Sequence, residues 1–519
     1  MGDSVAVAEE EGQMSIVHKL AGALALTALA VACQQGRVED VAGTETDGIT
    51  GASQTSGADT SSSSGGSEST DAIKLDFGGS SGGEIECADG SCNEIDLLFV
   101  MDNSGTMGEE QRNLAANLPR LVNQLQNLRD ADGNEVNPSV NIMVTTTDMG
   151  HPLCTPFQKP DYVPRQGAPV YTGCNSRINR FTGLELDDPL MVPEACTDNC
   201  PVDIAPGGPF IHFDIDKTNV PEDDVAAALS CIGPQGIDGC GYEAQLESML
   251  QALYPQACWN QPDQEHCEND PEWQGLNQGF LRPDAVLAVV MVTDEVECSV
   301  IPPDGFSYFT DDDQFWETNP DIDLAQATSA VCWNGGVDCE DGDGDGVYES
   351  CASRMNTQVL HPTERYTTYL RWLREELDKE VVMLGILGVP PVTAHNEDPP
   401  FQPTEGGVLA LEYRDWVDGE YPAGDILPEE WAAGVTADTK RFEFGPIGPG
   451  CTGQDMAGEF TGQAIAPTRI IEVCESLNYE DEDGEQQIRC CIESICDEDF
   501  SQAIDCLTGI LRTVSGPAG

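Results

Sequence analysis

The chain is most informative in the stretch IDLLFVMDNSGTM, which spans residues 95–107. A hydrophobic run of strand length ends at Asp102, and hydroxyl side chains follow at every second position, as Ser104 and Thr106. A carboxylate and two hydroxyls are hard oxygen ligands, so this spacing suits a small divalent cation that keeps one coordination position open. The stretch therefore predicts a buried strand that leads directly into a metal-binding loop.

A second stretch, VLAVVMVTDE at residues 286–295, is another hydrophobic strand run, and it ends at Asp294. In this order, the two stretches resemble the metal-ion-dependent adhesion site (MIDAS) of von Willebrand factor type A (vWA) domains, whose D-x-S-x-S/T motif closes the first strand. The resemblance implies that Asp102, Ser104, Thr106 and Asp294 bind one Mg²⁺ or Ca²⁺, with Mn²⁺ also possible. It also implies that an acidic group of a partner completes the coordination sphere.

The third element of the family is missing from this chain. Type A domains usually supply a threonine from the loop that opens a middle helix, and the best matching segment here is GCGYEAQLESML, residues 239–250. Glu243 stands where the threonine would be, so it is a candidate ligand. It could instead form a salt link, or complement the helix dipole as an acid in the first helical turn. The missing threonine argues against integrin-like ligand switching more than it argues against metal binding.

Other interpretations of these residues need no metal. Thr106 and Glu109 fit a helix capping box, although that leaves Asp102 and Ser104 without a role. Both interpretations can hold together, because the family's metal loop runs straight into a helix. Asp294 also fits an ordinary aspartate in a turn after a strand.

A later segment, CEDGDGDGVYESC at residues 339–351, carries a separate signal. It contains D-x-D-x-D-G, the front half of an EF-hand-type Ca²⁺ loop, in which Gly346 permits the sharp turn. The candidate Ca²⁺ ligands are Asp341, Asp343, Asp345, the carbonyl of Val347, and Glu349. Ala352 replaces the usual bidentate glutamate, and no flanking helices are evident. The alternative is a solvated acidic turn held between Cys339 and Cys351.

The charge balance restricts the possible partners. The 519 residues include 92 acids and 23 bases, which give a formal net charge of −69. Nucleic acid and anionic membrane surfaces repel such a chain, whereas divalent cations and basic partners are attracted to it. Acidity is equally typical of a protein that stays soluble in salty surroundings. No nucleic-acid partner is expected.

The N-terminal segment resembles a bacterial lipoprotein signal. The mostly apolar run Leu20–Ala32 is too short to span a bilayer but suits a secretory signal, and Cys33 follows it. We expect Met14 to be the true start, residues 1–33 to form the signal peptide, and lipidated Cys33 to be the only membrane contact. Plain cleavage without lipid is the alternative. The expected location is the cell envelope, in the outer membrane or at the cell surface.

The cysteine content agrees with export. Of the 21 cysteines, setting Cys33 aside leaves an even number, which suits disulfides in an oxidising compartment. Zinc sites are not indicated, because there is no C-x-x-C pair and the six histidines are scattered. Cys258 with Cys267 is a predicted local pair, whereas the neighbours Cys490 and Cys491 should have different partners.

The remaining pattern predicts the domain organisation. Residues 34–92 are rich in Gly, Ser, Thr and Asp and should form a flexible linker. From 93 to 513, buried strand runs alternate with helical stripes, which predicts one α/β domain with a doubly wound, mostly parallel sheet of Rossmann-like, vWA type. In such sheets, sites lie at the carboxyl ends of the strands. Large disulfide-rich insertions are expected near 150–208, 255–282, 296–361 and 389–466.

These features favour a binding protein over an enzyme. The chain has no G-x-S-x-G elbow between a strand and a helix, since its match at 78–82 lies in the Gly- and Ser-rich linker, and it has no H-E-x-x-H and no glycine-rich phosphate loop. The leading hypothesis is an envelope-anchored adhesion protein that recognises a protein or surface glycan through its metal. The alternatives are a structural surface protein stiffened by the metal, and a metal-dependent secreted hydrolase.

Overall fold

The centre of the molecule is a six-stranded sheet in a computed structural model that describes residues 94–183, 190–261, 273–454, 458, 460–481 and 484–515. The strands, in their order across the sheet, are β18 (Cys490–Ser494), β10 (Val381–Leu387), β4 (Val286–Val292), β1 (Glu94–Met101), β2 (Ser139–Thr146) and β3 (Ile211–Phe213). All neighbours run parallel except β3, which pairs antiparallel with β2. The predicted α/β class with a mostly parallel sheet is confirmed.

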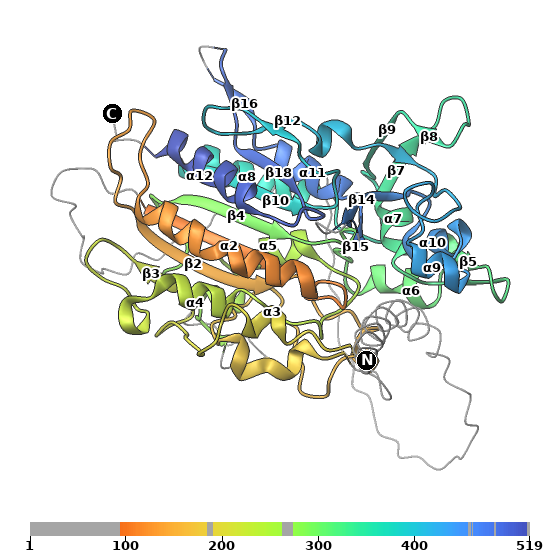
Figure 1. Ribbon diagram of the computed structural model, residues 1–519, viewed down its shortest axis with the longest axis horizontal. Coiled ribbons are helices and arrows are strands. Elements are labelled where there is room, and N and C mark those ends of the chain that lie inside the picture. The colour runs from red at the N-terminus through yellow and green to blue at the C-terminus, as the bar shows by residue number, and fades with distance from the viewer. Residues whose placement is uncertain are drawn as a thin grey trace, which may run out of the picture.

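Helices cover both faces of this sheet (Figure 1). One face packs against α2 (Gly108–Gln126), α4 (Val225–Ile232) and α12 (Ser501–Val514), and the other against α5 (Gln245–Leu253), α8 (Glu364–Leu377) and α11 (Thr468–Glu475). Successive strand residues alternate between the two cores: Leu97 and Phe99 join the first, Leu98 and Val100 the second. Because both faces are buried, the strands read as continuous hydrophobic runs rather than alternating ones.

Two local expectations from the sequence are wrong. The N-cap of α2 is Met107, and no side chain caps this end, so the capping box of Thr106 and Glu109 is not formed. The helix α5 begins at Gln245 with Ala244 as its N-cap. Glu243 therefore lies in the preceding loop and not in the first helical turn.

The long insertions share a core of their own. Buried side chains from both 296–361 and 389–466 meet in one cluster, which includes Trp333 and Trp416. Tyr242, from the loop before α5, belongs to the same cluster. In Figure 1 these elements gather on the right, beside the carboxyl ends of the strands. Hydrophobic packing therefore holds these insertions together in addition to disulfides.

The insertions are built from short elements. The helical ones are α3 (Glu194–Thr197), α6 (Ser307–Thr310), α7 (Ala330–Gly336), α9 (Pro428–Ala433) and α10 (Ala437–Phe444). The strands are β5 (Glu317–Asn319), β6 (Leu324–Gln326), β7 (Val337–Glu340), β8 (Val347–Tyr348), β9 (Ser350–Ser353), β11 (Ala394–His395), β12 (Pro403–Glu405), β13 (Tyr413–Arg414), β14 (Pro449–Gln454) and β15 (Phe460–Ile465). Outside the insertions, β16 (Tyr479–Glu480) pairs with β17 (Gln486–Gln487) between α11 and β18.

Eight disulfides lie within the part of the chain that the structure describes. They join Cys154 to Cys240, Cys174 to Cys196, Cys200 to Cys231, Cys298 to Cys332, Cys339 to Cys351, Cys451 to Cys496, Cys474 to Cys490, and Cys491 to Cys506. Cys490 and Cys491 have different partners, as predicted. Cys258 is also disulfide-bonded, but its predicted partner Cys267 lies outside the described residues. Such a density of disulfides is typical of extracytoplasmic proteins.

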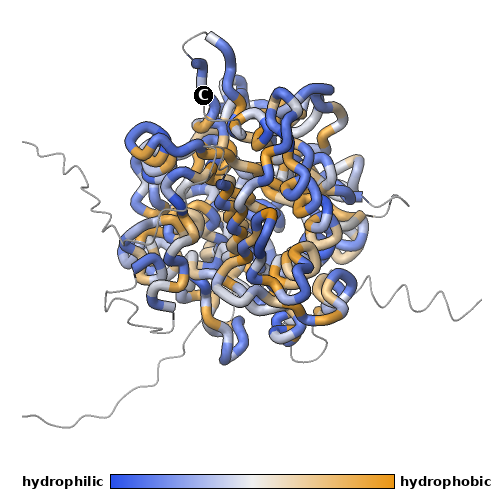
Figure 2. Tube along the Cα trace, turned by 90° about the vertical axis from the view of Figure 1, so that its left-hand side faces the viewer, coloured by the Kyte–Doolittle hydropathy of each residue, from blue (hydrophilic) through white to orange (hydrophobic). Residues whose placement is uncertain are grey.

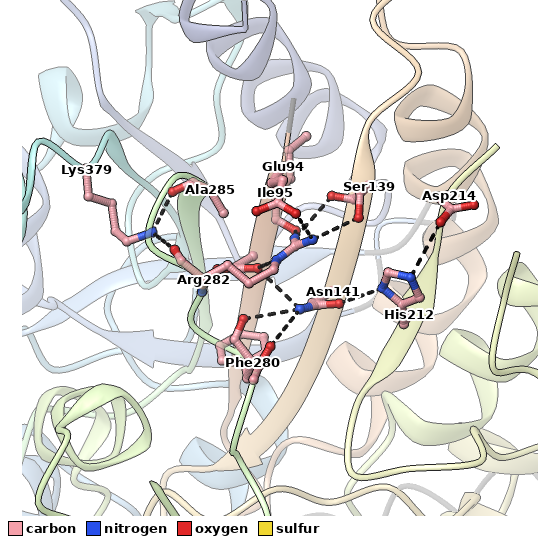
Figure 3. A network of polar contacts seen from close by, with 12 residues as sticks. Glu94, Ile95, Ser139, Asn141, His212, Asp214, Phe280, Arg282, Ala285 and Lys379 are labelled. Atoms are coloured by element: carbon pink, nitrogen blue, oxygen red, sulfur yellow. Dashed lines mark hydrogen bonds and ion pairs between the residues drawn. The ribbon is translucent and has the colours of Figure 1, made fainter. Parts of the chain in front are cut away.

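A polar network holds the amino ends of the strands (Figure 3). Arg282 bonds to the carboxylates of Glu94 and Asp96, at 3.1 and 2.7 Å, and to the Ser139 hydroxyl at 2.8 Å. Burial raises the pKa of Asp96 to about 6, against the lowering effect of Arg282. This edge of the sheet therefore contains a buried aspartate with a cationic partner.

The outside of the molecule is mainly hydrophilic, and the hydrophobic segments gather inside (Figure 2). Among the described residues, no helix is both long and apolar enough to cross a membrane. The predicted signal peptide 1–33, the lipidation site Cys33 and the linker 34–92 lie outside the described residues.

Candidate metal centre

Three parallel strands end side by side at the predicted site. Met101 at the end of β1 is in register with Thr146 of β2 and with Val292 of β4. The ladder continues one step further, because the Asp102 amide donates to the Val292 carbonyl at 3.0 Å. The residues after these strands are therefore held next to one another, as the parallel-sheet rule predicts.

Asp102 lies at the centre of this edge and is fully buried. Its Oδ1 accepts from the Ser104 amide at 2.8 Å, and its Oδ2 accepts from the Thr293 hydroxyl at 2.5 Å. The Ser104 and Thr106 hydroxyls are 3.4 Å apart. Burial raises the pKa of Asp102, and these hydrogen bonds oppose the effect. The D-x-S-x-T loop thus folds back around its own aspartate.

Glu243 is held against the same group from the loop before α5. Its side chain is fully buried, and its Oε2 accepts a hydrogen bond from the Thr147 hydroxyl, directly after β2. Its Oε1 is buried with no hydrogen-bond partner. Burial and the negative charges of Asp102 and Asp148 raise the pKa of Glu243 well above its ordinary value.

Asp294 approaches from the end of β4. Burial and repulsion from Asp102 raise its pKa to about 7, and a hydrogen bond with Thr106 opposes this. Its Oδ1 is buried without a hydrogen-bond partner. Its backbone carbonyl accepts from the Ile465 amide of β15 at 2.8 Å, so the β14–β15 hairpin is anchored beside it.

The structure adds three acids that the sequence reasoning did not name. Asp148 follows β2, and Glu295 follows Asp294; both are buried. Glu110, in the first turn of α2, also faces Asp294. The pKa values of all three are raised, first by burial and, for Glu110 and Glu295, by repulsion from Asp294. Asp148 could have been found from sequence, because it follows the strand-like run VNIMVT, residues 140–145, much as Asp294 follows the run 286–292.

This group of acids has no cationic side chain to balance it. Within the part of the chain that the structure describes, none of Asp102, Glu243, Asp294 and Glu295 has an ion pair with Lys, Arg or His. Buried acids elsewhere do have one: Asp96 pairs with Arg282, and Glu297 with Arg469. An unpaired buried carboxylate is costly, so such groups are normally paired or bind a metal. The orphaned oxygens of Glu243 and Asp294 therefore fit a divalent cation.

The site differs in layout from the calcium-type loop. Asp102, Glu243 and Asp294 are all described residues, but their carboxylate oxygens are not all within 4.8 Å of one another. Glu243, Asp294 and Glu295 each lie close enough to Asp102 for its charge to raise their pKa values. Thr106 is exposed whereas Ser104 and the acids are buried, so Thr106 marks the open side of the site.

The calcium-type loop is formed as a compact acidic turn. Oxygens of Asp341, Asp343 and Asp345 all lie within 4.8 Å of one another, and Gly346 has a φ of +82°. The Asp345 carboxylate accepts from the Val347 amide at 3.0 Å, and the Glu349 carboxylate accepts from the Gly342 amide at 2.8 Å. The Cys339–Cys351 disulfide and the pairing of β7 with β9 close the base of the loop.

The fold and this site define an α/β protein with an acidic, hydroxyl-bearing centre at the carboxyl edge of a mostly parallel sheet. Comparison with known protein families finds no family model that matches the chain. Comparison with curated proteins finds no match either.

Proposed function

We propose that this chain is a vWA-type, exported binding protein whose Asp102 centre holds a divalent cation. The observation that supports this most directly is the set of buried carboxylate oxygens with no partner, on Glu243, Asp294 and Glu295. They surround the D-x-S-x-T loop at the carboxyl ends of β1, β2 and β4. A cation there would remove the repulsion that raises the pKa values of these acids.

Asp102, Ser104, Thr106 and Asp294 would hold the cation, with Glu243 as the additional acid in place of the family's threonine. Oxygen ligands of this kind favour Mg²⁺, Ca²⁺ or Mn²⁺ over Zn²⁺. When bound, the ion supplies a Lewis-acidic position that an acidic group of a partner can occupy. If Glu243 ligates, its charge strengthens metal binding and weakens the attraction for an anionic partner.

The exposed Thr106 gives the expected direction of approach for a partner, which we propose to be a protein or a surface glycan with an acidic group. The proposed setting is the bacterial cell envelope, with Cys33 lipidated and residues 34–92 as a tether. The disulfides support an oxidising compartment. The linker composition would let the folded part reach well beyond the membrane surface.

The binding function predicts an association that depends on divalent cations. The immobilised protein should retain a partner from envelope extracts in millimolar Mg²⁺ or Ca²⁺ and release it in chelator, as measured by pull-down and mass spectrometry. Asp102→Asn and Asp294→Asn should each abolish retention, whereas Asp216→Asn, at an exposed aspartate away from the site, should not. Retention that is unaffected by chelator and by both site variants would contradict the proposal.

A second candidate function is a structural metal that only stiffens the fold. The burial of Asp102 and Glu243 favours it, because a folded partner could not reach these carboxylates directly. Under this alternative, Asp102→Asn would lose the metal-dependent rise in melting temperature while no partner is lost. The pull-down and the melting curve together distinguish the two functions.

The second proposed cation is Ca²⁺ at Asp341, Asp343, Asp345, Val347 and Glu349. Because three close carboxylates repel one another, Ca²⁺ should raise the melting temperature in a concentration-dependent way. Changing the three aspartates together to asparagine should remove the part of this rise that comes from the loop, as measured by calorimetry in an Asp102→Asn background. A rise that persists unchanged in that variant would show that the loop is only an acidic turn.

A further inference from the structure

A separate cavity lies beside the metal loop, on the side of the inserted segment that follows β2. Its volume is about 250 Å³. Asn103, between Asp102 and Ser104, and Thr146, the last residue of β2, form its inner end. The outer walls carry Tyr162, Arg165, Arg177, Arg180 and Trp273. This volume is below the roughly 300–1,000 Å³ of drug-sized pockets, so it suits a small ligand.

The cavity concentrates positive charge in a strongly acidic protein. Three of the chain's 23 basic residues line it, and among the described residues the only acid in its lining is Asp161, whose side chain is 69% exposed. Burial, and then repulsion from Arg165, lower the pKa of Arg177 to about 9. Asp203 opposes this lowering, and Arg177 remains charged at neutral pH.

Aromatic rings hold two of the arginines in position. The Arg165 guanidinium lies 5.3 Å from the centre of the Trp273 ring, and that of Arg180 lies 5.2 Å from the Tyr162 ring. Arg180 also pairs with Asp238 at 2.7 Å. Guanidinium groups fixed by stacking lose little freedom when an anion binds.

Three of the residues that line this cavity carry a buried polar atom without a hydrogen-bond partner: Nη1 of Arg177, Oδ1 of Asn103 and Oγ1 of Thr146. Asn103 is 1% exposed and Thr146 is 3% exposed. The Asn103 amide nitrogen donates to the Tyr162 hydroxyl at 2.9 Å, which fixes the amide so that its oxygen remains an acceptor. The cavity thus offers a donor for an anion, an acceptor for a hydroxyl, and one hydroxyl of its own.

We propose that this cavity binds an acidic sugar unit, a ring that carries both a carboxylate or sulfate and free hydroxyls. The arginines recognise the anion, with Arg177 Nη1 as the unused donor, and Asn103 Oδ1 accepts from a sugar hydroxyl. A neutral sugar would leave Nη1 of Arg177 without an anionic partner, and a bare anion would leave the Asn103 oxygen unsatisfied. No metal takes part, so the inference does not depend on the metal site.

The test is isothermal titration of the folded protein in chelator with D-glucuronate, D-glucose and inorganic sulfate. Glucuronate should bind saturably, and at least about tenfold more tightly than glucose or sulfate, because hydrogen bonds to charged groups are the stronger ones. Arg177→Gln should weaken glucuronate binding by about tenfold or more. Arg120→Gln is the control with the same change in charge, because Arg120 pairs with Asp505 on the exposed side of α2.

A second variant keeps the test valid if Arg177→Gln fails to fold. Thr146→Val removes a hydroxyl that bonds to nothing in the protein, so it should leave the melting temperature nearly unchanged and still weaken glucuronate binding several-fold. No saturable binding of glucuronate by the wild-type protein would overturn the proposal. So would equal affinity for glucose or sulfate, or an equal loss of affinity in Arg120→Gln.

Discussion

Glu243→Gln is expected to make the protein more stable in chelator, by about 1–3 kcal/mol in the free energy of unfolding at neutral pH. Without a cation, Glu243 is a buried acid that faces Asp102 and Asp148, and glutamine removes its charge while retaining an oxygen for the Thr147 hydroxyl. Urea unfolding in chelator measures the difference. Few substitutions of a buried acid stabilise a protein, so the sign alone is informative.

The stability difference between Glu243→Gln and the wild-type protein should reverse its sign in millimolar Ca²⁺ or Mg²⁺. There the wild-type protein gains the free energy of metal binding, and the variant binds the ion more weakly because one negative charge is missing. Wild type should then be the more stable of the two. If Glu243→Gln has the same effect with and without divalent cations, Glu243 is not part of a metal site.

The pH dependence in chelator follows from the raised pKa of Glu243 in the folded state. A folded-state pKa above the unfolded value means that the folded protein holds the proton more tightly, so stability is lost as the pH rises above the ordinary glutamate pKa. The advantage of Glu243→Gln should therefore grow from pH 5 to pH 8. Glu247→Gln is the control, because Glu247 is buried but paired with Arg365 at 2.9 Å. That variant should be destabilised with or without metal.

Of the eight disulfides in the described residues, Cys154–Cys240 is expected to cost the most free energy of unfolding when it is removed. The bond spans 86 residues, and the chain-entropy account gives about 4–5 kcal/mol for such a loop. It also ties the segment after β2 to the loop that carries Glu243. Cys154→Ala together with Cys240→Ala should therefore lower both the melting temperature and the affinity for divalent cations.

The matched control is the Cys339–Cys351 disulfide, which spans 12 residues. Its removal should cost about 3 kcal/mol and leave metal binding at the Asp102 centre unchanged. Calorimetry and a metal titration on both double variants test this. Equal metal affinities in the two variants would show that the longer cross-link does not support the loop of Glu243.

The sheet could be predicted largely because its strands are buried on both faces. The runs 97–101 and 286–292 are hydrophobic throughout, and the structure places β1 and β4 there. The edge strand β18 was missed, because its sequence CCIES holds two cysteines and two polar residues. The three-residue β3 was missed because it is too short to show a pattern.

The candidate centre was predictable where acids directly end a strand, and less so elsewhere. Asp102 and Asp294 come from that rule, and Asp148 would have followed from it too. Glu110 could not be predicted, because its proximity to Asp294 depends on how the first turn of α2 lies against the end of β4. The cavity beside Asn103 was also beyond sequence reasoning, since Arg165, Arg177 and Trp273 are distant in the chain and meet only through the fold.

The β14–β15 hairpin beside Asp294 affects how fast a cation could exchange. With the Ile465 amide bonded to the Asp294 carbonyl and the acids buried, an ion among them would be closed off on the side of the hairpin and would exchange on the side of the exposed Thr106. A partner that covers Thr106 would close this remaining route, and exchange would then wait for a local opening, in the microsecond-to-second range or slower. The complex would therefore keep the cation with which it formed.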